Sequence, residues 1–544
     1  DLILMGGAIS TMDSSRPEAT AIAIKGDRIL AVGSEAEVLR YADAETRQID
    51  LQGNFLMPGF IEGHAHFLGL GQSMMMLKLA DAKTWDEIVQ QVAEAAKVTP
   101  EGEWIIGRGW HQSKWTQPPE SNVGGYPTDA RLSELTRNHP VLLTHASGHM
   151  SFANSYAMRL AGVSDATADP KGGEILRDTN GKATGVFREK AQGLISRAHS
   201  RDEAKLNSSK RLEQSMRAIE LASEECLQKG ITSFQDAGSS FRVVDLLKRA
   251  ADQRKLGVRL YVMIRDSNEA LELQLPKYKM IGYGGDFLTV RSVKRSIDGA
   301  LGAHGAWLLA PYEDLPTSAG LNTASIPSVT RTAELALKNN YQVCVHAIGD
   351  RANREVLDIY ENLFVQNPSL IPRRWRIEHA QHLHPDDIPR FGELQVIASI
   401  QGVHCTSDAV FVPKRLGIRR SGEGAYAWQS LLKSGAIVIN GTDAPVEDVD
   451  PLASFYASVT RRLAAGVTFF PEQKMTRMQA LRSYTVDAAY AAFEESQKGS
   501  LVPGKLADMV VLSNDLRVCP EDVIRDTAVL YTIVGGKVVF QKSE

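Results

Sequence analysis

Two histidines one residue apart, His64 and His66, are the first side chains along the chain whose types and spacing could bind a metal ion. They follow a short apolar segment, and an i, i+2 spacing puts both imidazoles on the same side of an extended chain. Imidazole is a common ligand of zinc and similar divalent ions. Such a pair is also compatible with packing inside a strand, so it predicts a metal site only together with other ligands.

Further polar residues stand at the ends of later apolar segments. Lys294, His346 and His379 each end a predicted strand, and Asp443 follows another. Because the carboxyl ends of the strands of a parallel barrel meet at one rim, we expect these side chains to lie near His64. Histidines, a lysine and a carboxylate have the composition of a hydrolytic metal site. The residues therefore predict a centre for one or two divalent ions, with Zn²⁺ as the expected metal.

The elements that must position these residues are short apolar runs that alternate with helical segments. This alternation indicates βα units and a parallel sheet, and eight units favour a (β/α)8 TIM barrel. A long gap after the first strand predicts a large insertion at about residues 70–228. The predicted strands are Phe60–Gly63, Ile231–Phe234, Val258–Ile264, Leu288–Val293, Tyr341–Val345, Arg374–Ile377, Val396–Ile400 and Ala436–Ile439.

Both ends of the chain have the pattern of short strands and hairpins. A turn at Gly26-Asp27 separates two apolar stretches, and Gly535-Gly536 separates two more. We expect the two ends to form one small β-sandwich-like domain beside the α/β barrel. The predicted boundaries are 1–57 and 498–544 for this composite domain and 58–497 for the barrel.

Composition narrows the classes of function. The chain has 544 residues, 43% of them hydrophobic and 23% charged, and a formal net charge of -4. This balance argues against nucleic acid as a partner, and no apolar run is long enough to span a membrane. We expect a small-molecule substrate, and a homo-oligomer stays open. We expect a cytoplasmic protein, or a periplasmic or secreted one if a signal peptide was removed before Asp1.

Several segments together resemble the amidohydrolase superfamily, in particular the branch that contains N-substituted formamide deformylases (amidohydrolase family 3). They include the proline-glycine entry into the first strand with its two histidines, and the resemblance covers essentially the whole chain. Glu62 and His111 stand where these relatives usually or often have aspartate. The segments that carry the resemblance are 56–66, 345–350, 376–381, 440–445 and 501–508.

The resemblance implies a role for each candidate ligand. One ion would be held by His64, His66 and Asp443, and a second by His346 and His379. Lys294 would be carboxylated and bridge the two ions, which makes chemical sense because a lysine ammonium has no lone pair for a cation.

The resemblance also implies a reaction, hydrolysis of a C–N bond in an amide, formamide or cyclic amide. The metal would lower the pKa of a water toward about 7, and Asp443 would act as general base and then general acid. His149, after an apolar run in the insertion, would orient the substrate or polarise an oxyanion; a structural histidine is the alternative. Ester, lactone or phosphoester hydrolysis at the same site stays open, as does a non-catalytic scaffold. Signatures of serine hydrolases and nucleotide enzymes are missing from the sequence.

Overall fold

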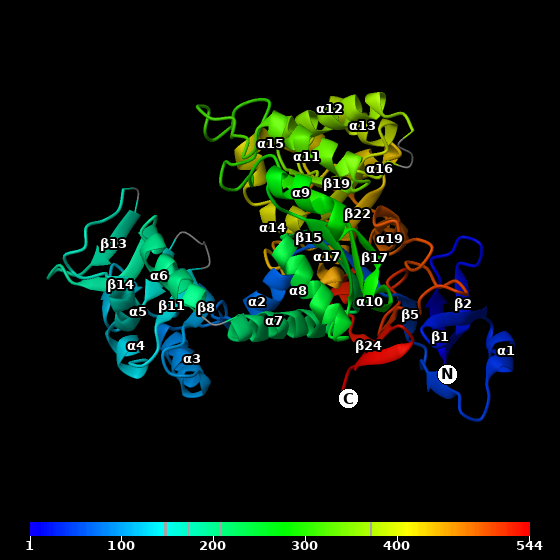
Figure 1. Cartoon of the computed structure of the whole chain (residues 1–544), viewed down its shortest axis with the longest axis horizontal. Helices are drawn as coiled ribbons and strands as arrows, with labels where there is room; N and C mark the ends of the chain where they lie inside the picture. Colours follow the sequence, from blue (N-terminus) through cyan, green and yellow to red (C-terminus); the bar gives the residue numbers. More distant parts are fainter. Residues whose placement is uncertain (146–149, 172, 206–207, 370–372, 544) are drawn as a thin grey trace. The chain divides into compact units, whose positions relative to one another are not determined.

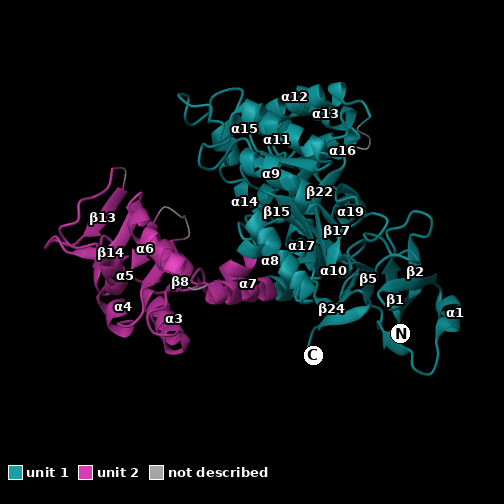
Figure 2. Cartoon of the chain, in the orientation of Figure 1, with its two compact units in different colours: residues 1–69, 222–544 teal, residues 70–221 magenta. Residues whose placement is uncertain are grey.

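The computed structural model describes residues 1–145, 150–171, 173–205, 208–369 and 373–543. It divides into two compact units (Figure 2). The first, residues 1–69 and 222–544, contains a barrel and the strands from both ends of the chain. The second, residues 70–221, contains the insertion. Within the described residues, no helix combines the length and apolar composition that crossing a bilayer requires.

Eight parallel strands form a nearly closed barrel, and each predicted strand is confirmed with shifts of a few residues at its ends. Consecutive strands pair in chain order, and the last strand lies beside the first. All residues of the third strand are buried, as expected for a parallel sheet covered on both faces. The strands are β6 (Phe60–Ala65), β15 (Ile231–Ser239), β16 (Arg259–Ile264), β18 (Leu288–Ser296), β19 (Gln342–Ala347), β20 (Arg376–His379), β21 (Ile397–Gln401) and β22 (Val438–Gly441).

Helices between the strands cover the outside of the barrel and fix where each strand ends. In α11, Ser325 accepts a hydrogen bond from the backbone N–H of Ser328 and so caps the helix, whose apolar residues face the barrel. The larger helices are α7 (Ser208–Gln228), α8 (Phe241–Asp252), α9 (Asn268–Tyr278), α11 (Ile326–Lys338), α12 (Asp350–Gln366), α15 (Val412–Gly424) and α17 (Pro451–Thr460).

Strands from both ends of the chain form one sheet with a shared apolar core, as predicted. Strand β5 pairs antiparallel with β23, which joins the N-terminal strands to the C-terminal ones. In Figure 1 the blue N-terminal strands and the red C-terminal strands lie close together. The strands are β1 (Leu2–Ser10), β2 (Glu18–Lys25), β3 (Arg28–Gly33), β4 (Arg47–Asp50), β5 (Phe55–Pro58), β23 (Met509–Leu512), β24 (Val529–Val534) and β25 (Lys537–Gln541). The exact domain boundaries given above stay a prediction.

The insertion has its own sheet and its own core. Six strands pair in the order β13-β14-β12-β11-β8-β7, and Trp85, Trp110 and Phe152 are buried among them. The insertion also contains helix α3 (Trp85–Val98), whose buried residues include Trp85. The strands are β7 (Leu77–Lys78), β8 (Ile105–Trp110), β11 (Val141–His145), β12 (Met150–Ala153), β13 (Gly173–Arg177) and β14 (Ala183–Glu189).

Candidate metal centre

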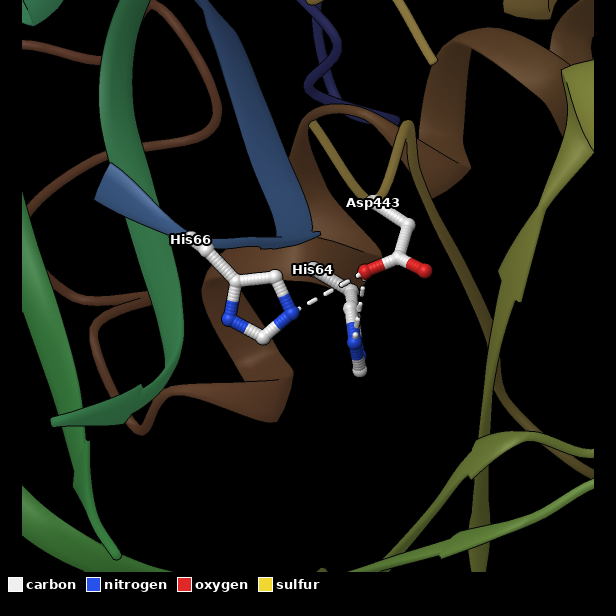
Figure 3. A group of neighbouring side chains, drawn as sticks. All are labelled: His64, His66 and Asp443. Carbon is white, nitrogen blue, oxygen red and sulfur yellow. Dashed lines mark ion pairs between the residues drawn. The ribbon is translucent and has the colours of Figure 1, made fainter. Parts of the chain in front are cut away.

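The predicted site begins at the carboxyl end of β6 and meets the loop after β22. His66 Nε2 lies 3.2 Å from Asp443 Oδ1, and His64 Nε2 lies 3.5 Å from the same oxygen (Figure 3). One ligand atom from each of the three residues lies within 4.8 Å of the others. Two imidazole nitrogens and a carboxylate oxygen so close together can bind one cation.

Asp443 is held in an unusual backbone conformation. Its φ of 59° is left-handed, which is uncommon for a residue other than glycine, and its N–H donates to the carbonyl of His64 at 2.7 Å. Burial alone would raise the pKa of the Asp443 carboxyl, but the imidazoles of His64 and His66 beside it outweigh burial and hold this pKa well below its usual range. The residue is therefore a carboxylate at neutral pH.

Glu62 connects the two strands that carry these ligands. Its buried carboxyl accepts hydrogen bonds from the N–H groups of His64 (3.1 Å) and Thr442 (2.8 Å). Burial raises the pKa of Glu62 to about 8. The role of the glutamate is therefore structural, because its hydrogen bonds hold the loop that carries Asp443 against β6.

Lys294 is buried inside the barrel, near the first strand. Lys294 lies in β18, and its Nζ is 3.5 Å from His64 Nε2. Burial lowers the pKa of Lys294 to about 8, despite the nearby carboxylates of Glu378 and Asp443. The lowered pKa makes the neutral amine, the form that can react as a nucleophile, more accessible at neutral pH than in an exposed lysine.

His346 and His379 bring the ends of β19 and β20 to the same place. Their ring centroids are 4.4 Å apart, and the ring of His379 lies 4.7 Å from that of His64. Burial lowers the pKa of His346 to about 3 and holds that of His379 well below its usual range. Both imidazoles are neutral at pH 7 and so have a lone pair for a cation.

Buried carboxyl and amide side chains support these two histidines. His379 Nδ1 lies 2.6 Å from Gln401 Oε1, and His346 Nε2 lies 3.5 Å from Asp298 Oδ1. Asp298 also accepts hydrogen bonds from the N–H groups of Ile348 and Gly349, which fixes the loop after β19. Asp298 was not among the predicted site residues, because it lies two residues beyond the end of β18, the strand that carries Lys294.

His404 is a site residue that the sequence prediction missed. It lies in the short helix α14 (Gly402–Asp408) after β21, and its ring is nearly parallel to that of His379, with centroids 6.3 Å apart. One of its ring nitrogens, a ring nitrogen of His379 and a carboxylate oxygen of Asp443 all lie within 4.8 Å of one another. Its position shortly after the seventh predicted strand, at the same rim of the barrel, was the signal in the sequence that could have identified it.

The structure brings six of the predicted residues together: His64, His66, Lys294, His346, His379 and Asp443. The seventh, His149, lies outside the described residues. The side-chain atoms His346 Nε2, His404 Nε2 and Asp443 Oδ1 are buried and have no hydrogen-bond partner among the described residues. Buried polar atoms without partners are costly, so imidazole nitrogens and a carboxylate oxygen in this arrangement fit a divalent cation.

Comparisons with known proteins agree with this arrangement. The amidohydrolase family model matches residues 47–540. The chain is 35% identical to the protein LONG AFTER FAR-RED 3 of Arabidopsis thaliana, over 99% of this chain and 91% of that protein. It is 27% identical to the N-substituted formamide deformylase of Arthrobacter pascens, over 100% of this chain and 99% of that enzyme. An uncharacterized metal-dependent hydrolase of Pyrococcus furiosus superposes with a TM-score of 0.77 at 28% identity, over 95% of this chain and 100% of that one. This chain is a member of the amidohydrolase family.

Proposed function

We propose that this amidohydrolase cleaves a C–N bond of a small molecule, in an amide, formamide or cyclic amide. The observation that carries the proposal is the meeting of six predicted residues from five strand ends, with polar atoms that are buried and unpartnered among the described residues. The full-length similarity to an N-substituted formamide deformylase supports the type of bond. Fold alone would not support it, because barrels of this kind host many reactions.

The residues present suit two ions. His64, His66 and Asp443 would hold the first, and His346 and His379 the second. A ligand atom of His379 groups with those of His404 and Asp443, and the ring of His346 lies beside that of His379. Zn²⁺ is the ion we propose, because it accepts imidazole and carboxylate ligands together. When bound, such an ion supplies a water of lowered pKa and polarises a carbonyl oxygen.

Asp443 would move the proton. Its carboxylate is ionised at neutral pH, so it can accept a proton from the attacking water and donate it to the leaving nitrogen. The hydrogen bond from its N–H to the His64 carbonyl fixes the carboxylate beside the first histidine pair. Base and ligands are therefore positioned by the same backbone contact.

Lys294 would carry the bridging group. Its neutral amine adds to CO₂, which forms an N–C bond and releases one proton, and the resulting carbamate presents two anionic oxygens. The low pKa and the position beside His64 support this modification. Intact-mass measurement of the native protein should show the added mass of one CO₂, lost on acidification.

Ester, lactone and phosphoester hydrolysis are the second candidate, since polarised carbonyl and phosphoryl centres make similar demands on such a site. The test is an activity screen of metal-depleted and zinc-reconstituted protein against N-acyl compounds, formamides, cyclic amides, esters and lactones. We expect zinc-dependent turnover of C–N substrates. Turnover of only esters or lactones would favour the second candidate, and full activity without metal would refute the proposal.

A further inference from the structure

A buried ion pair beneath the candidate metal centre has a consequence for its first ligand. We propose that Glu378, held in place by Arg376, positions the imidazole of His64 so that Nε2 is free to bind a cation. The inference rests on the metal site proposed above. Glu378 would thus be a positioning residue that acts through His64.

The contact between Glu378 and His64 fixes which ring nitrogen carries the proton. His64 Nδ1 donates a hydrogen bond to Glu378 Oε2, in a fully buried environment. The proton therefore sits on Nδ1, and the lone pair is on Nε2. Nε2 is the atom that lies 3.5 Å from both Asp443 Oδ1 and Lys294 Nζ, so it points to the centre. A carboxylate behind a metal-binding histidine generally fixes the tautomer and the ring orientation.

Arg376 in turn fixes Glu378. Its Nε lies 2.7 Å from Glu378 Oε1, and one terminal nitrogen lies 3.0 Å from Oε2. The same terminal nitrogen donates to the carbonyl of Gly63 at 2.7 Å and to the hydroxyl of Ser399 at 2.9 Å. The guanidinium therefore joins β20 to β6 and β21, and Glu378 has little freedom to rotate away from His64.

Burial separates this arrangement from an ordinary surface ion pair. Both side chains are 0% exposed, where an unpaired charge would be very costly. Burial would raise the pKa of Glu378, but Arg376 and His64 outweigh it and hold this pKa well below its usual range. Arg376 and Glu378 stand two residues apart in a strand, on the same side of it.

A second buried pair in this unit offers a matched control. Arg259 Nε lies 2.6 Å from Asp508 Oδ2 and a terminal nitrogen lies 3.0 Å from Oδ1, with both side chains 4% exposed or less. Asp508 Oδ1 accepts its further hydrogen bond from the backbone N–H of Gly535 and not from a histidine. Neutralising either carboxylate removes one buried charge, but only the Glu378 change alters the partner of His64.

The experiment measures zinc affinity of metal-depleted protein by competition with a chromophoric chelator. We expect Glu378→Gln to weaken the tightest Zn²⁺ site by about 10- to 100-fold, the usual cost of losing such a supporting carboxylate. Asp508→Asn should leave the Kd within about twofold of wild type while lowering stability. Equal Kd values for wild type and Glu378→Gln would overturn the proposed role of Glu378 and leave the proposed function standing. Wild type that binds no zinc would overturn the proposed function as well.

A measurement on the unaltered chain does not depend on how well the variants fold. In protein labelled with ¹⁵N-histidine and depleted of metal, the His64 signals, assigned by comparison with His64→Gln, should show the Nδ1–H tautomer. An Nε2–H tautomer would contradict the proposed role of Glu378. Arg376→Lys, which keeps the charge but loses the fork of the guanidinium, should weaken zinc binding in the same direction as Glu378→Gln, and unchanged affinity would also count against it.

Discussion

The two ends of the barrel use similar polar residues for different purposes. At the amino end, Arg259 and Asp508 form a forked ion pair that also receives the N–H of Gly535, and so joins the barrel to the composite sheet. At the carboxyl end, His346 Nε2 and Asp443 Oδ1 are buried without a hydrogen-bond partner among the described residues. The ion pair at the amino end stabilises the fold, whereas the polar atoms without hydrogen-bond partners at the carboxyl end can bind a ligand.

The carboxyl end also contains backbone conformations that a structural role alone does not require. His379 has a φ of 75° and Asp443 a φ of 59°. Such conformations in residues other than glycine cost of order 1–3 kcal/mol and tend to occur at functional sites. We therefore expect substitutions at the amino end of the barrel to change stability, and substitutions of the site residues at the carboxyl end to change metal binding or turnover.

The largest effect is expected at Asp443. Asp443→Ala removes the proposed proton acceptor, so we expect kcat to fall by about 10²- to 10⁴-fold. Steady-state kinetics on the best substrate of the screen, with zinc content measured on the same sample, checks this. Near-normal kcat in a fully metallated variant would remove Asp443 from the proposed mechanism.

Lys294 tests whether the carboxyl end holds two ions. Lys294→Met keeps an unbranched, buried side chain but cannot be carboxylated, so we expect the zinc content to fall from two ions per chain to one. Metal analysis after dialysis measures this directly, and far-UV circular dichroism serves as the folding control. Two tightly bound ions in the variant would argue against a bridging role for the lysine.

Asp508 should show the opposite behaviour. Asp508→Asn leaves Arg259 buried beside a neutral amide, so we expect a loss of about 3–5 kcal/mol in the free energy of unfolding. Urea titration of wild type and variant measures this loss. Turnover per zinc-loaded chain should stay within about twofold of wild type at a temperature where both proteins are folded. A large fall in kcat would show that the amino end of the barrel also affects catalysis, and would contradict the comparison.

Glu62 should show its effect only as a dependence of stability on pH. Its pKa is about 8 in the folded chain and lies near 4.5 when exposed, so the folded state keeps a proton that the unfolded state loses. Its contribution to stability is fully present below pH 4.5 and is lost as pH rises toward 8, at up to about 1.4 kcal/mol per pH unit. Urea titrations of metal-free protein should show a shallower pH dependence for Glu62→Gln. Parallel curves for both proteins would refute this assignment.

Much of the architecture could be predicted because the strands of a parallel barrel are buried on both faces and read as short apolar runs. The ligands at their ends followed from the rule that such ends share one rim, which brought Lys294, His346 and His379 to one place. The hairpin at Gly535-Gly536 was predictable from its turn residues and is confirmed between β24 and β25.

Other parts depend on contacts that no single segment encodes. His404 was missed because it stands in the first turn of a helix instead of at the end of an apolar run. Glu378 was visible next to His379, but its role comes from His64, which lies more than three hundred residues earlier in the chain. The alternation of Arg376 and Glu378 in a buried strand was the overlooked signal, because two charges there must be paired. The sheet of the insertion could not be predicted, since its short strands show weak periodicity.

The pairing of β5 with β23 has a consequence for the order of events during synthesis. Phe55 lies opposite Leu512, so the N-terminal strands leave the ribosome long before their partner exists. At about 5–20 residues per second the wait is roughly 20–90 s, during which β5 can pair with β1 but its other edge lacks β23. The barrel strands are complete before β23 emerges, so we expect this composite sheet to be the last part of the first unit to close. Nascent chains stalled before Met509 should therefore be cut by protease within residues 1–57, whereas released full-length chains should resist.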